Sequence, residues 1–238
     1  MSDDARVRAY YDDFAARYER GRDVGYHALL DALELSILLP HCEGREVLEL
    51  GCGTGLLLEE VARVASRAVG VDLSPGMLEK ARAKGLDVVE GSVTSLPFPD
   101  ASFDVVYSFK VLAHVEAIDR ALAEAVRVTR PGGTIVLELY NRWSLRYLAK
   151  RLAGPGKVSA SRDESEVFTR WDTPRTALAR IPQGTSVVET YGVRVATPAA
   201  FFHRIPLVRE ALAAAERKLM RSPLRRFGGF YVLVLKRL

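Results

Sequence analysis

Several features that define particular classes of protein are absent from this sequence. It contains only two cysteines in 238 residues, Cys42 and Cys52, which is too few for a disulfide framework or a cysteine-based metal cluster. No apolar run approaches the ~18 residues that a transmembrane helix needs. Residues 1–4 are acidic where a secretion signal would be basic and then apolar. These absences predict a cytoplasmic protein without a metal site.

Length and apolar content favour one α/β domain. With 48% hydrophobic residues among 238, the chain can bury one sizeable core. The formal net charge is +4, but residues 1–140 carry 15 Lys and Arg against 23 Asp and Glu, whereas residues 141–238 carry 19 against 7. This asymmetry indicates either that the C-terminal portion faces an anionic ligand or partner, or that it has a basic, solvated surface.

Residues 47–55 are the most informative stretch of the chain. They predict a short apolar strand, a turn through Gly51, Gly53 and Gly55, and the start of a helix. Glycine suits such a turn because it adopts positive φ and lets a ligand approach bare backbone. The N–H groups that begin the helix suit a carboxylate or phosphate, and the carboxylate of Glu49 suits a cation such as an ammonium group. The pattern therefore predicts a cofactor-binding loop.

A second strand, predicted over 68–72, also ends on an acid, Asp72. At this distance from a glycine loop, a carboxylate accepts hydrogen bonds from both hydroxyls of a ribose. Ser74 and Pro75 then supply the N-cap and first residue of a helix. The glycine spacing is Gly-x-Gly-x-Gly, and position 56 is leucine where a dinucleotide-binding loop would have its third glycine. This spacing disfavours a nicotinamide cofactor.

Residues 49–55 resemble motif I of the class I S-adenosylmethionine-dependent methyltransferases, Glu-x-Gly-x-Gly-x-Gly. Residues 96–106, Leu-Pro-Phe-Pro-Asp-Ala-Ser-Phe-Asp-Val-Val, are similar to a segment of the type 11, UbiE-like subgroup, and residues 131–133 match its Pro-Gly-Gly turn. The resemblance covers residues 10–140 and weakens beyond them. It implies S-adenosylmethionine as cofactor and S-adenosylhomocysteine as product.

The resemblance also implies a fold. We expect a Rossmann-like α/β domain over the whole chain, with a seven-stranded, mostly parallel sheet in the order 3-2-1-4-5-7-6 and helices on both faces. Its parts would be an N-terminal helical cap (1–40), a cofactor-binding core (44–140), an acceptor lid (141–184) and C-terminal strands with an inserted helix (185–238). The inserted helix, flanked by arginines, suits docking on the core better than contact with a membrane surface or an anionic partner.

Carried onto matching positions, the resemblance implies a set of cofactor contacts. An N-terminal aromatic helix would cover the cofactor through Tyr18, with Tyr11 a second candidate. Leu73 and Met77 would flank the adenine, although Met77 equally suits core packing. The family's Gly-Asp-Ala turn is Gly-Ser-Val here, so the Ser92 hydroxyl or Val93 backbone would replace the aspartate. The expected cofactor-binding residues are Tyr18, Glu49, Gly51, Cys52, Gly53, Asp72, Leu73, Met77, Ser92, Val93, Ser108 and Phe109.

His114 is the candidate catalytic residue. It lies in Leu-Ala-His-Val, where the family commonly shows Leu-His-His-Val or Leu-Glu-His-Val, just after the strand that ends at Ser108 and Phe109. An imidazole can accept a proton near neutral pH. The alternative interpretation is a histidine that packs on its helix and bonds to backbone.

The leading hypothesis is a methyltransferase that acts on a small phenolic, quinol-like or anionic acceptor. One alternative is methylation of tRNA or another nucleic acid, which the basic C-terminal portion favours but the absence of a known RNA-binding module disfavours. Another is a protein that binds S-adenosylmethionine without catalysis. The sequence gives no oligomeric state.

Overall fold

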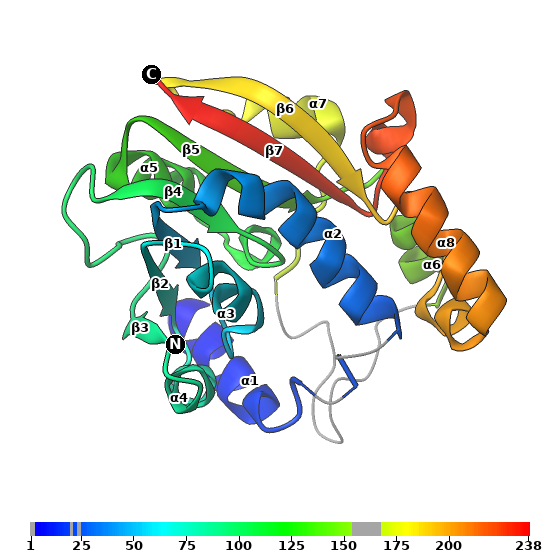
Figure 1. The fold of residues 1–238 in the computed structure, drawn as a ribbon, viewed down its shortest axis with the longest axis horizontal. Helices are drawn as coiled ribbons and strands as arrows, with labels where there is room; N and C mark the ends of the chain where they lie inside the picture. Colours follow the sequence, from blue (N-terminus) through cyan, green and yellow to red (C-terminus); the bar gives the residue numbers. More distant parts are fainter. Residues whose placement is uncertain (1–2, 20, 23–24, 154–167) are drawn as a thin grey trace.

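The computed structural model describes residues 3–19, 21–22, 25–153 and 168–238. Within them, seven strands form one sheet in the order β3-β2-β1-β4-β5-β7-β6 (Figure 1). Strands β1 to β5 pair in parallel, and β7 runs antiparallel to both of its neighbours, β5 and β6. The predicted fold and strand order are confirmed. The strands are β1 Glu46–Leu50, β2 Arg67–Asp72, β3 Asp87–Glu90, β4 Phe103–Ser108, β5 Thr129–Tyr140, β6 Thr185–Val193 and β7 Phe230–Arg237.

Helices cover both faces of this sheet. Because side chains alternate along a strand, Val47 of β1 belongs to a core cluster with Ile37 of α2, whereas the next residue, Leu48, belongs to a cluster with Leu122 of α5. In Figure 1, α2 crosses one face and α5 lies behind the sheet. The helices are α1 Asp3–Ala15, α2 Gly25–Cys42, α3 Leu56–Ala62, α4 Pro75–Ala83, α5 Ile118–Val128, α6 Leu145–Ala153, α7 Pro174–Ala179 and α8 Pro206–Leu219, with single-turn segments η1 Leu112–His114, η3 Ala200–Arg204 and η4 Pro223–Phe227.

The Pro-Gly-Gly turn at 131–133 lies inside β5, where the register against β4 shifts. Gly132 has φ +73°, and a Cβ on Gly133 would lie 2.6 Å from Thr129 Cγ2 and 2.8 Å from the Asp104 carbonyl oxygen. A side chain at Gly133 would therefore clash with the neighbouring backbone. The turn therefore forms an irregularity within β5, which begins before it at Thr129.

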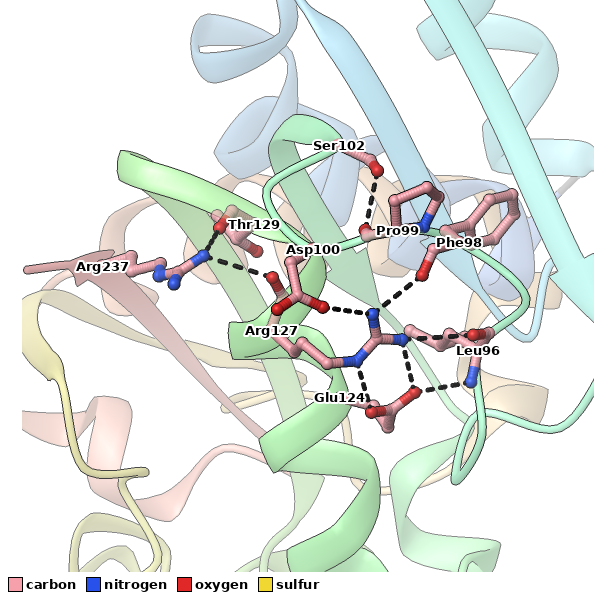
Figure 2. Close-up of polar contacts among 9 residues, drawn as sticks. All are labelled: Leu96, Phe98, Pro99, Asp100, Ser102, Glu124, Arg127, Thr129 and Arg237. Atoms are coloured by element: carbon pink, nitrogen blue, oxygen red, sulfur yellow. Dashed lines mark hydrogen bonds and ion pairs between the residues drawn. The ribbon is translucent and has the colours of Figure 1, made fainter.

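Arg127 of α5 holds the loop that leads into β4 (Figure 2). Its guanidinium donates to the carbonyl oxygens of Phe98 (2.8 Å) and Leu96 (3.1 Å) and to the Asp100 carboxylate (2.8 Å). Glu124 accepts from Arg127 at 2.7 and 2.8 Å and from the Leu96 N–H at 2.7 Å, and its hydrogen bond with Arg127 lowers the pKa of Glu124. Two residues of α5, Arg127 and Glu124, thus fix the conformation of this loop.

Two helix ends are set by local contacts. Helix α2 continues through Pro40 to Cys42, although proline often ends a helix. Pro40 removes one helical hydrogen bond, but the last turn buries Cys42 completely. Helix α6 begins at Leu145 because the preceding Ser144 hydroxyl accepts the Tyr147 N–H at 3.1 Å and caps the helix.

The inserted helix α8 docks on the body of the protein as expected. Its fully buried Glu216 accepts the N–H groups of Val195, Ala196 and Thr197 at 2.7, 3.0 and 2.9 Å. None of the helices within the described ranges combines the length and apolar character needed to cross a membrane. Residues 154–167 of the predicted acceptor lid lie outside the described residues.

Candidate active site

A cavity of about 740 Å³ lies at the carboxyl ends of the parallel strands, where ligands bind in open α/β sheets. It reaches from Asp72, which ends β2, to Phe230, which begins β7. Ten of the predicted site residues line it: Tyr18, Gly51, Gly53, Asp72, Leu73, Met77, Ser92, Val93, Phe109 and His114.

Three predicted residues lie outside the lining. Glu49 is buried beneath the loop and accepts the Tyr107 hydroxyl at 2.9 Å; burial raises its pKa to about 8. The Cys52 side chain packs in a cluster with Leu58 of α3 and with Leu78 and Ala81 of α4. The Ser108 hydroxyl is fully buried and donates to the Leu50 carbonyl at 3.0 Å. For these three, direct cofactor contact stays a prediction.

Asp72 is held in one orientation by backbone. One carboxylate oxygen accepts the Gly53 N–H at 2.8 Å and the other accepts the Ser74 N–H at 2.9 Å. Burial is the largest influence on its pKa and raises it, while these hydrogen bonds act in the opposite direction. Each oxygen keeps a further lone pair, so the carboxylate is oriented and still able to accept from a diol.

The glycines of the loop have different reasons to be glycine. A Cβ on Gly51 would lie 2.4 Å from a methyl group of Val111, and one on Gly55 would lie 2.3 Å from Leu86, so both positions are set by packing. At Gly53, with φ +54°, the nearest atom to such a Cβ is in the Tyr18 ring at 4.0 Å. Gly53 is therefore the glycine that offers bare backbone to a ligand.

Helix α1 packs beside α4 (Figure 1), and its residues Tyr10, Tyr11 and Phe14 line the cavity. Asp12 accepts from the Ser74 hydroxyl at 2.5 Å and from the Gly76 N–H at 3.0 Å. Lys84 donates to Glu19 at 2.6 Å. These contacts hold the Tyr18 ring near Gly53 of the glycine loop, where it lines the cavity. Its contact with the cofactor stays a prediction. Sequence reasoning did not single out Asp12.

His114 lines the cavity and is also bonded to backbone, so the structure combines features of both sequence interpretations. Its Nδ1 lies 2.9 Å from the Phe168 carbonyl oxygen, and its Nε2 lies 3.3 Å from the Tyr140 hydroxyl. Because a carbonyl can only accept, Nδ1 carries the proton in that contact. Nε2 of the neutral ring is then the acceptor for the Tyr140 O–H.

The other end of the cavity is cationic and was missed by sequence reasoning. Lys110, Arg146 and Arg194 line it. The charge of Lys110 is balanced by Asp31 and Glu34, whose oxygens lie 2.7 Å from its ammonium group. The signal in the sequence was only the excess of basic residues after position 140, which does not say which of them face inward.

The sequence model of a family described as "Methyltransferase domain" matches residues 48–137. The demethylmenaquinone methyltransferase of Renibacterium salmoninarum is 36% identical over 180 residues, which cover 68% of this chain and 73% of that protein. This chain belongs to the type 11, UbiE-like S-adenosylmethionine-dependent methyltransferases. The predicted family is therefore confirmed.

Other relatives of this methyltransferase-family chain match over a shorter stretch. A protein of Mycolicibacterium smegmatis named as an S-adenosylmethionine-dependent methyltransferase is 39% identical over 107 residues, or 44% of this chain and 42% of that one. The chain thus spans about half the length, or less, of several curated relatives that it matches.

Solved structures support the fold. A SAM-dependent methyltransferase of Thermotoga maritima matches with a TM-score of 0.69 at 21% identity, covering 97% of this chain and 99% of that one. One from Mesorhizobium loti matches with a TM-score of 0.62 at 23% identity, covering 87% and 98%. These likenesses concern the fold alone.

The residues at the β2 end of the cavity fit the family's cofactor. Asp72 has two carboxylate oxygens that a ribose diol could approach, Gly53 presents bare backbone, and Leu73, Met77 and Val93 give this part of the lining the apolar character that an adenine would need. The Ser92 hydroxyl is engaged with Thr94 Oγ1 at 2.9 Å. A cavity of this volume is typical of sites for small organic ligands.

Proposed function

We propose that this chain transfers the methyl group of S-adenosylmethionine to a small phenolic or quinol-like acceptor. The observation that carries the proposal is one continuous cavity that contains both the oriented Asp72 carboxylate and the His114–Tyr140 pair. When bound, the cofactor supplies a methyl group activated by a sulfonium leaving group. The protein has to hold the acceptor in line, exclude water and take up a proton.

The proton would pass through Tyr140 to His114. The acceptor hydroxyl donates its proton to Tyr140 Oη while the Tyr140 proton moves to His114 Nε2, 3.3 Å away. The Phe168 carbonyl, 2.9 Å from Nδ1, fixes the ring and stabilises the resulting imidazolium. Loss of the hydroxyl proton raises electron density on the oxygen and on the conjugated ring carbons, so O- and C-methylation would use the same pair.

The relative of Renibacterium salmoninarum supports a quinol-like acceptor, because its name assigns demethylmenaquinone as substrate. Aromatic side chains in the cavity suit a flat ring: Tyr26, Tyr140 and Phe230 line the end that faces β5 and β7. Stacked and edge-on ring contacts would orient such an acceptor.

Two measurements test the proposal. Calorimetric titration with S-adenosylhomocysteine should show saturable binding; no binding at millimolar concentration would end it. Incubation with methyl-labelled S-adenosylmethionine and a set of phenols and quinols should then give label in at least one acceptor and none in tRNA. Binding without transfer to any acceptor would favour a non-catalytic protein, and label in tRNA would favour the nucleic-acid alternative.

A further inference from the structure

Two arginines, Arg146 and Arg194, line the β7 end of the cavity, and neither has a counter-ion among the residues that the structure describes. Arg146 is 9% exposed and Arg194 is partly buried, and both line the cavity. They flank the backbone of Gly229, because a Cβ placed there would lie 3.2 Å from the Cδ atom of each. No carboxylate of the described residues lies within ion-pair distance of either guanidinium.

The surroundings of Arg146 hold its cation without neutralising it. Its guanidinium lies 4.1 Å from the ring centre of Tyr140, 4.6 Å from that of Phe230 and 4.8 Å from that of Trp171. Its Nη1 is buried and has no hydrogen-bond partner in the described residues. Burial raises the pKa of the nearby Glu138, while the charges of Lys110 and Arg146 act in the opposite direction. Glu138 Oε1 accepts the Lys110 N–H at 3.1 Å and forms no ion pair with Arg146.

Arg194 is held in a conformation that a non-glycine residue rarely adopts. Its φ is +62°, which costs about 1 kcal/mol or more for a residue with a Cβ. The Gly229 N–H donates to the Arg194 carbonyl at 2.9 Å and fixes this geometry. Its guanidinium donates to the carbonyl oxygens of Thr197 (3.2 Å) and Pro198 (2.9 Å) and lies over Tyr26. Burial and the charge of Arg146 both lower the pKa of Arg194.

We propose that Arg146 and Arg194 bind an anionic oxygen group, a carboxylate or a phosphate, carried by the methyl acceptor. Arg146 is buried and Arg194 is partly buried, so water screens the repulsion between their charges poorly, and an anion bound by both would remove that cost. Guanidinium groups also match carboxylate and phosphate oxygens in shape. This inference rests on the proposed function and narrows its acceptor class to phenols or quinols with an acidic substituent.

The proposed anion site and the cofactor site lie at opposite ends of one cavity, several strands apart along the same edge of the sheet. Asp72 ends β2 and Phe230 begins β7, and the strand order places four inter-strand steps between β2 and β7. At roughly 4.8 Å a step, the distance is about 19 Å, enough for a nucleoside and an aromatic acceptor placed end to end. An acceptor whose acidic group is held near β7 would therefore direct its opposite end toward the cofactor.

The test uses three small probes titrated calorimetrically into the complex with S-adenosylhomocysteine. These are 4-hydroxybenzoate, 4-hydroxyphenyl phosphate and the neutral 4-hydroxybenzamide. We expect at least one of the anions to bind at least tenfold more tightly than the amide, and its affinity to fall as NaCl rises from 50 to 300 mM. Whichever of the two anions binds more tightly shows whether the site prefers a carboxylate or a phosphate. Equal affinities for anions and amide, or no binding of any probe, would overturn the inference.

Variants then assign the preference to these residues. Arg146→Met and Arg194→Met should each reduce the preference for the anion at least tenfold. Arg142 is exposed and lies just before α6, the helix that carries Arg146, so Arg142→Met should keep the preference. Arg146→Lys keeps the charge and should restore part of the preference, which would show that the loss in Arg146→Met does not come from misfolding. An anion preference that survives in Arg146→Met contradicts the inference. Intact S-adenosylhomocysteine binding without anion preference would defeat this inference and leave the proposed cofactor site standing.

Discussion

The two ends of the cavity are built in different ways. At the end near β2, where we propose that the cofactor binds (the cofactor end), Asp72 receives hydrogen bonds from Gly53, 19 residues before it, and Ser74, two residues after it. At the other end, where we propose that the acceptor binds (the acceptor end), His114 bonds to Phe168 and Tyr140, which are 54 and 26 residues away. Short strand–loop–helix units therefore specify the cofactor end, and contacts between distant segments specify the acceptor end.

The ends also differ in charge. The cofactor end presents the carboxylate of Asp72, whereas Arg146 and Arg194 line the acceptor end. This division follows the sequence asymmetry, in which acids predominate before position 141 and bases after it. The comparison teaches that one cavity can join a locally encoded site, recognisable from its motif, to one whose specificity is set by packing. Four substitutions test this contrast.

The largest effect is expected at the acceptor end. His114→Gln should lower kcat for a phenolic acceptor about 100- to 10,000-fold, because the Tyr140 proton loses its acceptor, and should leave S-adenosylhomocysteine affinity within about twofold of the original. Steady-state kinetics and calorimetry measure the two quantities. His41→Gln, a change near the end of α2 outside the cavity lining, is the control. A kcat that stays the same would remove His114 from the proton path.

The next effect belongs to the cofactor end. Asp72→Asn should weaken S-adenosylhomocysteine binding at least tenfold, because an amide accepts at only one of its two ends and loses the charge that strengthens both ribose hydrogen bonds. Asp87→Asn, at an exposed carboxylate on the neighbouring strand β3, is the matched control in the same calorimetric titration. Equal affinity in the two variants would show that the ribose lies elsewhere.

The buried Glu49 makes the free energy of unfolding depend on pH. Its folded pKa of about 8 lies above its ordinary value near 4.5, so between those values the folded protein holds a proton that the unfolded chain releases. The contribution of this bound proton to the stability of the folded state is complete below pH 4.5 and is lost as pH rises through 8. From pH 5 to 8, Glu49→Gln should therefore remove a decline of about 1.4 kcal/mol per pH unit in the free energy of unfolding.

Urea unfolding at several pH values measures this decline. Glu59→Gln, at a carboxylate on the surface of α3 that pairs with Arg63, should leave the pH dependence as it was. If the curves of Glu49→Gln and the parent protein run parallel, Glu49 is not the group that titrates.

The smallest effect is expected where α1 is fastened to α4. Asp12→Ala should lower the free energy of unfolding by about 1 kcal/mol, because it removes the acceptor for the Ser74 hydroxyl and the Gly76 N–H. In a double-mutant cycle, Ser74→Ala should cost less in the Asp12→Ala background than in the original protein. Strictly additive effects would mean that the two side chains do not interact in solution.

The Ser74 cap and several residues that line the cavity near β2 could be predicted from the sequence. Each depends on residues close together in the chain: a strand that ends on an acid, a glycine turn, a proline at the first turn of a helix. The strand order was predicted from the resemblance to a known family. The predicted contacts at Glu49, Cys52 and Ser108 lay on the right strands and loop. Which way their side chains point depends on packing, and the structure shows them in contact with Tyr107, Leu58 and Leu50 respectively.

The amino-acid sequence by itself determined the family, through motifs that resemble those of known methyltransferases, and the fold followed from that resemblance. Its glycine turn and its Ser74 cap follow from backbone geometry that only certain residues allow. Only the tertiary structure decided which basic residues face inward, because Arg146 and Arg194 meet through the pairing of β7 with β5 and β6, far along the chain. The local sequence pattern determines which backbone conformation a segment adopts. The neighbours of a side chain are fixed when distant segments pack together.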